Sequence, residues 1–351
     1  MEEITSAIAK YQPIINTTIE EFCQQSLAEA KSDYGKNFTQ IFEAYLSVLQ
    51  RGGKRFRGAL AMHSYELFGG KDSEVSRQVG LVMEMLQAYL LVIDDLVDQS
   101  DFRRGEPAAH KMIENLHETN KLAGDMTHFG VSQTIFSGII GQNIAYDIIA
   151  KLPVEDSIRL TGLAFVNDIM IKTNVGQIMD VNNAAWLVDD EAQILQTLRQ
   201  KTAHYSVFLP LKIGAILAGG DAEFIKPFAM NVGLAYQLHN DIQGTFGDES
   251  KTGKPAKDDI VEGKRTILLT YALTNTTPTD REFLERAAGN TNLTEDDFER
   301  VLKIMRDSGA LEYTLKLAAY YTNLATEVLD SAPKELADKL DLLRIIAKQN
   351  I

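Results

Sequence analysis

An acidic cluster at the end of an apolar segment is the first candidate for chemistry. Four aspartates lie within the eight residues DDLVDQSD (94–101), directly after the largely apolar stretch LVMEMLQAYLLVI (81–93). On an ideal helix, steps of three and four residues place one set of side chains on a single stripe: Glu84, Gln87, Leu91, Asp94, Asp98 and Asp101. Because the other faces of the segment are apolar, we expect a buried helix whose stripe lines an internal space.

The spacing of Asp94 and Asp98 indicates a metal site. Residues four apart on a helix have Cβ atoms about 5–6 Å from each other. Two carboxylates at that range repel, and burial increases the repulsion. Mg²⁺ removes the conflict, because it takes oxygen ligands and bridges one or two carboxylates to phosphate oxygens. The segment therefore predicts a helix that carries Mg²⁺ to a phosphate group.

Two arginines follow the acidic cluster. Arg103 and Arg104 come where we expect the helix to end, near Gly105 and Pro107. Guanidinium groups bind phosphate oxygens with two parallel hydrogen bonds. The pair is therefore predicted to contact the same phosphates as the metal ions.

A second segment, YQLHNDIQGTFGDESKTGKP (236–255), repeats this logic. Gln237 and Asp241 are four apart, Asn240 lies between them, and the preceding residues are again largely apolar. Two such helices that faced each other would hold one metal–phosphate cluster from both sides. We therefore expect the two acidic segments to lie opposite each other across a central cleft.

Further basic residues lie next to turns and helix starts. Lys54 and Arg57 are three apart and follow a glycine pair, which would let an anion approach a helix N-terminus. Lys201 and Thr202 precede the apolar run YSVFLPLKIGAIL. That dipeptide carries no signal by itself.

Helical periodicity dominates the elements that must position these residues. The segments 38–50 and 312–329 repeat apolar residues at three- and four-residue steps, and Thr294 and Asp297 are spaced like a capping box. Glycine pairs punctuate the helices, and we find no convincing strand or hairpin signal. We predict an all-α fold of antiparallel helices in a single domain, residues 1–351. The irregular stretch 247–266 is predicted to be a functional or mobile loop.

Composition narrows the class of protein. A net charge of −14 argues against binding to nucleic acid, which needs a basic surface. No apolar run approaches the ~20 residues that span a bilayer. With Cys23 as its one cysteine, the chain forms no internal disulfide, and we expect a cytoplasmic protein.

The motifs, taken together, resemble those of the trans-isoprenyl diphosphate synthases, the polyprenyl synthetase family. GGKRFRG, DDLVDQSDFRRG, GQIMD, KTA, YQLHND, FGDESKTGKP and EGKRT occur in the family's order. The resemblance covers about residues 52–266. It implies the all-α isoprenoid synthase fold, a homodimer and Mg²⁺. It also implies head-to-tail condensation of isopentenyl diphosphate onto an allylic diphosphate.

The resemblance also implies roles for individual residues. The metal ligands would be Asp94, Asp95, Asp98 and Asp241. The residues that hold the allylic diphosphate would be Arg103, Lys201, Lys254 and Lys264. Isopentenyl diphosphate would be held by Lys54, Arg57, Gln87 and Arg104. Thr202 and Gln237 match residues beside the reacting carbons, so the catalytic set would be Lys201, Thr202 and Gln237.

One departure from the family pattern keeps alternatives open. The second motif usually reads DDxxD, and here Asn240 and Gly244 replace two of the three aspartates. Asn240, Asp241, Gly244 and Asp248 nearly fit the second metal motif of class I terpene cyclases. Lys54, Arg57 and Arg104 argue for a second diphosphate and so for a synthase. A non-catalytic partner subunit of a prenyl synthase is the other alternative, and the intact first motif argues against it.

Product length depends, in this family, on bulky side chains along the first acidic helix. The fifth residue before Asp94 is Tyr89 and the fourth is Leu90. A single aromatic at the fifth position resembles archaeal-type geranylgeranyl synthases, so we expect a C20 product, with C15 next. On an ideal helix, however, Leu90 and Leu86 point nearer the cleft than Tyr89 does.

Overall fold

The computed structural model describes residues 6–247, 256–332 and 339–348 of this 351-residue chain. The regular elements among these residues are helices, apart from one two-stranded hairpin, so the all-α prediction is confirmed. None of the helices among them is long and apolar enough to cross a membrane. The chain divides into two compact units, which are described separately. The prediction of a single domain stays a prediction.

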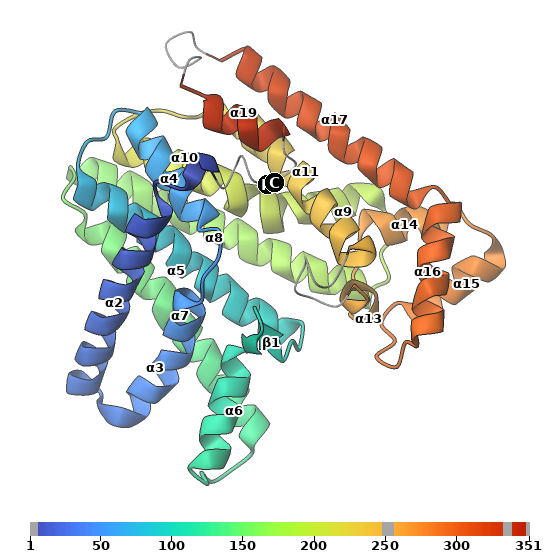
Figure 1. Ribbon diagram of the computed structural model, residues 1–351, viewed down its shortest axis with the longest axis horizontal. Coiled ribbons are helices and arrows are strands. Elements are labelled where there is room, and N and C mark those ends of the chain that lie inside the picture. The colour runs from blue at the N-terminus through green and yellow to red at the C-terminus, as the bar shows by residue number, and fades with distance from the viewer. Residues whose placement is uncertain (1–5, 248–255, 333–338, 349–351) are drawn as a thin grey trace. The chain divides into compact units, whose positions relative to one another are not determined.

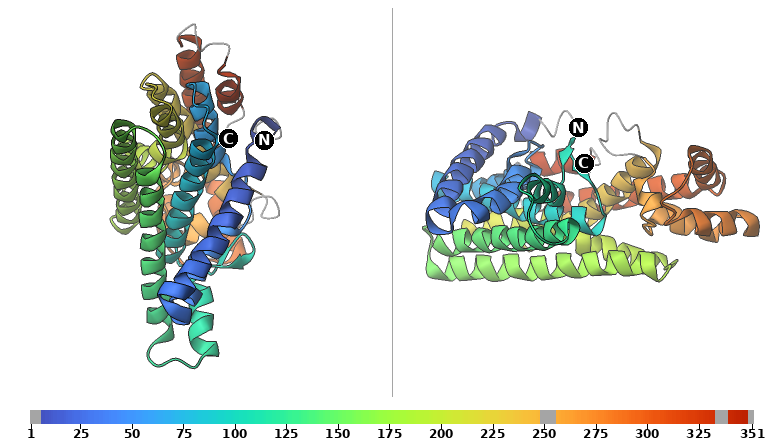
Figure 2. Two further views of the ribbon diagram at one scale, coloured as in Figure 1. Left: turned by 90° about the vertical axis from the view of Figure 1, so that its left-hand side faces the viewer. Right: turned by 90° about the horizontal axis from the view of Figure 1, so that it is seen from below.

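The N-terminal unit comprises Thr5–Phe165 and Pro210–Asp221. Its elements, labelled in Figure 1, are α2 (Gln12–Asp33), α3 (Gly35–Gln50), α4 (Phe56–Leu67), α5 (Ser73–Val97), β1 (Phe102–Arg103), β2 (Glu106–Pro107), α6 (Ala109–Thr119), α7 (Met126–Lys151), the start of α8 (Asp156–Ala185) and nearly all of α10 (Leu209–Leu217). Helix α5 is central and packs against α3, α4 and α7. Figures 1 and 2 show α5 and α7 side by side.

Helix α5 begins and ends at identifiable residues. Asp72 caps its start, where the Asp72 side chain accepts hydrogen bonds from the backbone N–H groups of Glu74 and Val75. The helix ends at Val97, and Gln99 has a left-handed backbone with φ of 53°. The predicted helix end near Gly105 and Pro107 is therefore wrong, because the left-handed residue stops the helix earlier.

The residues beyond this end form the hairpin β1–β2, which the sequence did not predict. Phe102 pairs with Pro107, and Arg103 pairs with Glu106. Arg104 and Gly105 connect the strands, and both have positive φ, 56° and 78°. Two successive positive φ values match the type I′ turn that joins twisted strands.

The C-terminal unit comprises Val166–Leu209 and Ala222–Ile351. Its described elements are the rest of α8, α9 (Glu191–Leu198), the π-helix η1 (Arg199–Phe208), α11 (Ile225–Phe246), α13 (Asp258–Val261), α14 (Ile267–Thr274), α15 (Pro278–Ala287), α16 (Glu295–Asp307), α17 (Ala310–Asp330) and α19 (Asp341–Lys348). Helix α11 packs against η1 and α17. The short helix α13 lies inside the stretch 247–266 that the sequence predicted as irregular.

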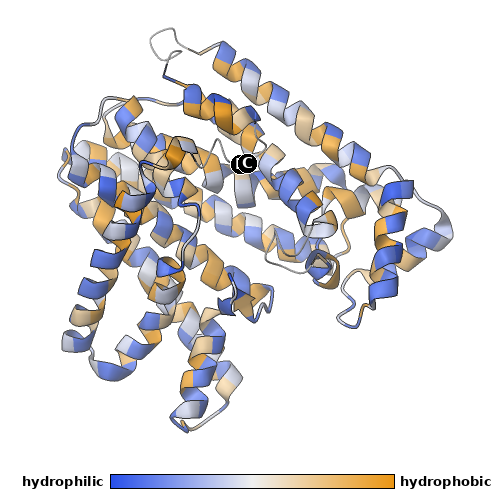
Figure 3. Ribbon diagram, viewed as in Figure 1, coloured by the Kyte–Doolittle hydropathy of each residue, from blue (hydrophilic) through white to orange (hydrophobic). Residues whose placement is uncertain are grey.

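Local sequence signals explain several helices of this unit. The side chain of Thr294 accepts from the backbone N–H of Asp297, which confirms the capping box at the start of α16. The buried residues of α16 recur at three- and four-residue steps, and Figure 3 shows hydrophobic and hydrophilic residues mixed along α16 and α17. The periodic segment 312–329 falls inside α17, as predicted.

The π-helix η1 is the irregular element of this unit. Its backbone follows the i to i+5 pattern, and the N–H of Leu209 donates to the carbonyl of His204. Pro210 follows directly, and its ring would collide with the carbonyl of Ser206 in a regular α-helix. π-Helical turns are rare and often lie at functional sites.

Candidate active site

The first acidic motif sits at the C-terminal end of α5. Asp94 and Asp95 lie in its last turn, and Asp98 is the residue directly after the helix. Arg103 of strand β1 donates from Nε to Asp95 Oδ1 at 2.8 Å, and its Nη2 lies 3.8 Å from Asp94 Oδ2. The hairpin therefore folds its first arginine back onto the aspartates, and Asp95 is 1% exposed.

Charge is balanced within this cluster. Burial alone would lower the pKa of Arg103, but the hydrogen bonds and charge of Asp95 outweigh it and raise the pKa above its ordinary value. Asp94 and Asp98 act in the same direction. A guanidinium held this way is fully charged and is directed at two of the three predicted metal ligands of this motif.

The predicted stripe on α5 is present in part. Gln87, Leu91 and Asp94 are partly exposed on a helix whose other residues are mostly buried. Asp101, in contrast, lies beyond the helix, is exposed, and has its carboxylate 3.4 Å from Lys111 Nζ. Its predicted place on the stripe is wrong because the helix ends at Val97.

Glu84, the first residue of the stripe, makes contacts that stabilise the fold rather than line the site. It is buried, and its Oε1 accepts from the backbone N–H of Gly58 at 3.0 Å. Its Oε2 lies 3.4 Å from Nη1 of Arg55, which also donates to the carbonyl of Leu49. Arg55 is 6% exposed and precedes α4 with a left-handed φ of 51°. Sequence reasoning missed Arg55, which holds the loop that carries Lys54.

The loop 51–55 and the hairpin β1–β2 are bonded to each other in both directions. Arg51 donates to the carbonyl of Pro107 at 2.7 Å, and Arg104 donates to the carbonyls of Arg51 and Gly52. Gly53 lets them approach, because a Cβ there would lie 2.9 Å from Arg104 Nη2. The structure thus brings Arg104 to the loop that carries Lys54. Arg104 and Lys54 are two of the four residues predicted to hold isopentenyl diphosphate. Arg57 lies in the first turn of α4.

The second motif, on α11, forms a hydrogen-bonded chain with η1. Thr202 Oγ1 donates to Gln237 Oε1 at 3.0 Å, and Gln237 Nε2 donates to Asp241 Oδ1 at 2.7 Å. The amide of Gln237 is oriented by both contacts. Thr202 of the motif KTA is therefore brought together with Gln237 and Asp241 of the motif YQLHND.

Asp241 is held in an environment that disfavours its charge. It is 6% exposed, and burial followed by the charge of Asp259 raises its pKa to about 8. Asp180 acts in the same direction, while Gln237 and Lys264 oppose it. Among the residues that the structure describes, Asp241 Oδ2 has no hydrogen-bond partner.

Two further carboxylates that the predictions did not include complete this region. Asp180 of α8 binds Lys201, with 2.6 Å between Oδ2 and Nζ. Asp259 of α13 faces Gly244, where an added Cβ would lie 2.6 Å from Asp259 Oδ2. Asp180 is the last residue of the quoted motif GQIMD, which was the available signal for it. Asp259 had none, because its approach depends on tertiary contact with a glycine.

Lys264 is also paired with acidic residues. Its Nζ lies 2.5 Å from Glu262 Oε2 and 3.6 Å from Asp259 Oδ1. Lys254, the remaining residue predicted to hold the allylic diphosphate, lies outside the described residues, as does Asp248. That the α5 and α11 motifs face each other across a cleft stays a prediction.

The three residues predicted to set product length lie in the body of α5. Leu86 is fully buried, and Tyr89 and Leu90 are 8% exposed. Tyr89 lies close to α7, because a Cβ at Gly138 would lie 3.5 Å from its ring atom Cδ2. Tyr89 therefore faces α7, and its role in product length stays a prediction.

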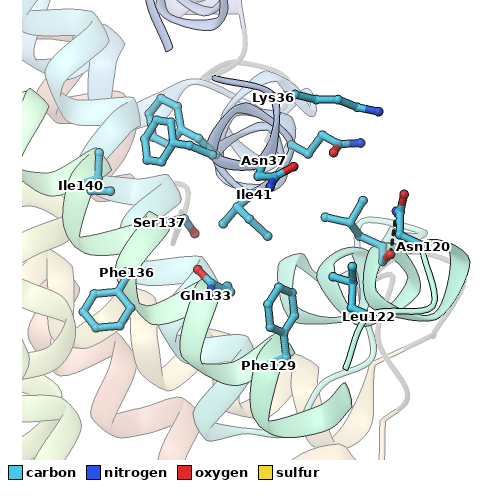
Figure 4. Close-up of a pocket in the computed structure, with 14 residues that line it drawn as sticks. Lys36, Asn37, Ile41, Asn120, Leu122, Phe129, Gln133, Phe136, Ser137 and Ile140 are labelled. Carbon is cyan, nitrogen blue, oxygen red and sulfur yellow. Dashed lines mark hydrogen bonds between the residues drawn. The ribbon is translucent and has the colours of Figure 1, made fainter. Parts of the chain in front are cut away.

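An apolar pocket of about 620 Å³ lies elsewhere in the N-terminal unit, between α3, α6 and α7. Figure 4 shows Ile41 of α3 opposite Phe129, Gln133 and Ser137 of α7. None of the predicted site residues lines it.

The residues present fit a divalent cation. Asp241 offers a buried carboxylate oxygen that no described group satisfies, and Asp94 and Asp98 lie one turn apart at the end of α5. No three carboxylate, imidazole or thiol groups within residues 6–247, 256–332 and 339–348 form a metal cluster by themselves. Mg²⁺ commonly takes one or two carboxylates and completes its shell with water and phosphate oxygens.

Comparison with known proteins matches these observations to one family. A family model described as polyprenyl synthetase matches residues 38–305. The chain is 31% identical over 303 residues to a geranylgeranyl diphosphate synthase of Saccharolobus solfataricus, covering 85% of each chain. It is 30% identical to a geranylfarnesyl diphosphate synthase of Aeropyrum pernix, covering 86% of this chain and 91% of the relative.

A solved structure extends the match to the fold. The geranylgeranyl pyrophosphate synthase of Corynebacterium glutamicum, complexed with isoprenyl diphosphate and magnesium, is 28% identical with a TM-score of 0.89. The alignment covers 97% of this chain and 98% of that chain. The predicted isoprenoid synthase fold is confirmed.

Proposed function

We propose that the main product of this chain is the C20 prenyl diphosphate, with C15 next. The chain belongs to the polyprenyl synthetase family and is a prenyltransferase that makes short-chain trans-prenyl diphosphates. The observation that carries the C20 assignment is Tyr89, the aromatic residue five positions before Asp94, which is buried on α5 beside Gly138 of α7. The relative from Saccharolobus solfataricus is named as a geranylgeranyl diphosphate synthase, which supports C20.

The two diphosphate groups would be held by different sets of cations. Isopentenyl diphosphate would be bound by Lys54, Arg57, Gln87 and Arg104. The bonds between the hairpin and the loop 51–55 support this set, because they hold Arg104 next to Lys54. The allylic diphosphate would be bound by Arg103, Lys201, Lys254 and Lys264. Lys201 and Lys264 would exchange a carboxylate partner for phosphate oxygens on binding.

Mg²⁺ would be held by Asp94, Asp95, Asp98 and Asp241. When bound, it neutralises negative charge on the diphosphate as that group leaves. The magnesium in the related structure from Corynebacterium glutamicum supports this choice of metal. The unsatisfied Oδ2 of Asp241 supports its assignment as a ligand.

Lys201, Thr202 and Gln237 would act beside the reacting carbons. Once it contacts the phosphate oxygens, the Lys201 ammonium would stabilise the negative charge that develops on the departing diphosphate. Thr202 and Gln237 present oriented dipoles, since each is committed to its neighbour by a hydrogen bond. None of these residues needs to act as a nucleophile.

A homodimer and a cytoplasmic location complete the proposal. Exposed apolar side chains lie along α7, at Ile135, Phe136 and Ile139. Similar side chains lie along α8 at Ile171 and Val175. Exposed apolar faces of this kind mark contacts between proteins. The buried free thiol of Cys23 is consistent with a reducing compartment. Light scattering on the wild type and on Phe136→Glu tests the dimer.

The activity is tested by incubating the chain with Mg²⁺, labelled isopentenyl diphosphate and each allylic starter in turn. Products are dephosphorylated and separated by chain length. A dominant C20 product supports the proposal. Cyclised products from a long allylic diphosphate, formed without isopentenyl diphosphate, would instead identify a cyclase.

Product length is tested on α5. Tyr89→Ala removes a ring beside Gly138 and is expected to lengthen the product, because an apolar chain gains by filling the space. Leu86→Ala is the matched variant one turn earlier on the same helix. If Leu86→Ala lengthens the product and Tyr89→Ala does not, Leu86 is the side chain that limits product length. The C20 assignment then loses its basis.

A further inference from the structure

We propose that Gly176 and Gly233 are positioning residues that hold the π-helix η1 from two sides and so set where Lys201 and Thr202 lie. The inference rests on the proposed function, in which those two residues act on the allylic substrate. It concerns contacts that all lie within the C-terminal unit.

Gly176 of α8 brings that helix against the backbone of η1. A Cβ at Gly176 would lie 2.3 Å from the backbone N of Lys201 and 2.6 Å from its Cα. Both atoms belong to the main chain, so no side-chain rotation could make room. One turn after Gly176, Asp180 binds the ammonium of the same Lys201 at 2.6 Å. A glycine and a carboxylate on one face of α8 therefore contact the backbone and the ammonium group of Lys201.

Gly233 of α11 makes the equivalent contact on another side of η1. A Cβ there would lie 2.4 Å from the Cα of Ala203 and 2.6 Å from its Cβ. One turn later, Gln237 accepts the hydrogen bond from Thr202 Oγ1 at 3.0 Å. The arrangement repeats that of α8: a glycine contacts the η1 backbone, and the residue four positions on binds an η1 side chain.

The π-helix needs external support of this kind. A π-helix is rarely stable by intrinsic preference, and η1 extends over ten residues. The close contact from α8 falls on Lys201 and the close contact from α11 falls on Ala203, the two residues that flank Thr202. The spacing of the three helices at this point is therefore set by the absence of two Cβ atoms.

Substitution would move the reacting groups. Gly233→Ala must push η1 away from α11, and the bond from Thr202 to Gln237 then lengthens or breaks. A displacement of about 1 Å in a catalytic group can cost about 10²-fold in rate. We expect Gly233→Ala and Gly176→Ala each to lower kcat by about that factor, with KM for isopentenyl diphosphate changed little.

The matched control is Gly162→Ala, the same substitution on the same helix α8 as Gly176. A Cβ at Gly162 would meet the end of the Ile213 side chain at 3.1 Å, and a flexible side chain can yield where a backbone cannot. We expect its kcat to stay within about twofold of the wild type, a change of no more than about 0.4 kcal/mol in the barrier.

A double-mutant cycle distinguishes a loss of kcat that acts through the Thr202–Gln237 hydrogen bond from a loss caused by a general disturbance of the fold. Thr202→Val keeps the side-chain shape and removes the hydroxyl that bonds to Gln237. If Gly233 acts through that bond, the loss from Gly233→Ala largely disappears in the Thr202→Val background. Additive losses, or an unchanged kcat for Gly233→Ala, would overturn the proposal.

A gentler variant covers the case in which Gly233→Ala does not fold. Ala203→Ser adds a single oxygen to the same contact from the η1 side and is expected to lower kcat less, again non-additively with Thr202→Val. Additive losses for this variant would also overturn the proposal. A wild type without condensation activity would instead contradict the proposed function itself, so the two failures are distinguishable.

Discussion

The two acidic motifs of this protein differ in how their charge is balanced. At the end of α5, Arg103 bonds to Asp95 and approaches Asp94, so the cluster carries its own counter-ion. At the corresponding place on α11, Asp241 is buried near Asp259 and Asp180, and its pKa is raised to about 8. The bonded partner of Asp241 is the neutral amide of Gln237.

This difference indicates which motif depends more on a bound cation. A carboxylate whose charge is already compensated can stay ionised without metal, whereas a buried carboxylate near other carboxylates takes up a proton instead. Asn240 fits that setting, because an aspartate there would add a further negative charge to a crowded region. We therefore expect metal binding at Asp241 to compete with protonation.

The largest expected effect comes from Asp94→Ala. Removing this predicted ligand should lower kcat by about 10²–10³-fold, the usual cost of one lost electrostatic contact to the transition state. It should also weaken the dependence on Mg²⁺. Folding should change little, because Arg103 keeps its bond to Asp95. Steady-state kinetics at limiting and saturating Mg²⁺ measure the effect.

Asp101→Ala is the control for this prediction. Asp101 belongs to the same sequence cluster but is exposed and lies beyond the helix, so its removal should leave kcat close to that of the wild type. Near-normal turnover of Asp94→Ala at limiting Mg²⁺ would show that Asp94 holds no metal.

The next effect is on stability and concerns Asp241. Without metal, the folded state keeps a proton on Asp241 up to about pH 8, while the unfolded state loses it near the ordinary value of 3.8. The free energy of unfolding therefore falls as pH rises through this window. Asp241→Asn cannot ionise and should lose less stability between pH 5 and pH 8. The difference should exceed about 1.4 kcal/mol, the equivalent of one pKa unit.

Urea unfolding of both proteins in the presence of a chelator, at pH 5 and pH 8, measures this difference. The other titrating groups are common to the two proteins and cancel in the comparison. Equal losses for wild type and Asp241→Asn would mean that Asp241 ionises normally in the folded protein.

The smallest expected effect is on metal affinity. Asn240→Asp restores a charged oxygen ligand and should lower the half-saturating Mg²⁺ concentration several-fold. Activity titrated against Mg²⁺ measures the change. A half-saturating concentration that does not fall would place Asn240 away from the metal.

Gly244→Asp provides the contrast, because it restores the other aspartate of the family motif directly against the carboxylate of Asp259. A Cβ at Gly244 would lie 2.6 Å from Asp259 Oδ2. The new side chain must displace Asp259 and repel it, so Mg²⁺ affinity should not improve. A tighter Mg²⁺ titration for Gly244→Asp would mean that Asp259 does not occupy this space.

Hydrophobic periodicity predicted the positions of the long helices. The end of α5 and the π-helix η1 were not predicted, because both depend on irregular backbone conformations. The segment 38–50 falls inside α3, because one buried face fixes a 3.6-residue repeat. The end of α5 was missed because Gln99 adopts a left-handed conformation that its residue type does not require. The π-helix η1 was missed because its residues also suit an α-helix.

The site was predictable where one motif supplied the residue and not where two segments meet. Asp94 and Asp98 were selected from their spacing along the first acidic segment, and Gln237 was selected from its spacing to Asp241 along the second. Asp259, whose charge acts on Asp241, was not recognised, because it approaches α11 at Gly244 only through tertiary packing. Arg55 looked like one cation among several in a basic stretch, and only its burial against Glu84 shows its structural contacts.

The most direct test of the account is to locate the metal ions. Crystals of the wild-type chain grown with Mn²⁺, isopentenyl diphosphate and an unreactive thio analogue of an allylic diphosphate would be measured at the manganese edge. We predict anomalous peaks within coordination distance of Asp94 and Asp98, and a separate peak at Asp241. A fully bound allylic analogue with manganese at α5 and none at Asp241 would contradict the claim that a cation completes the second motif.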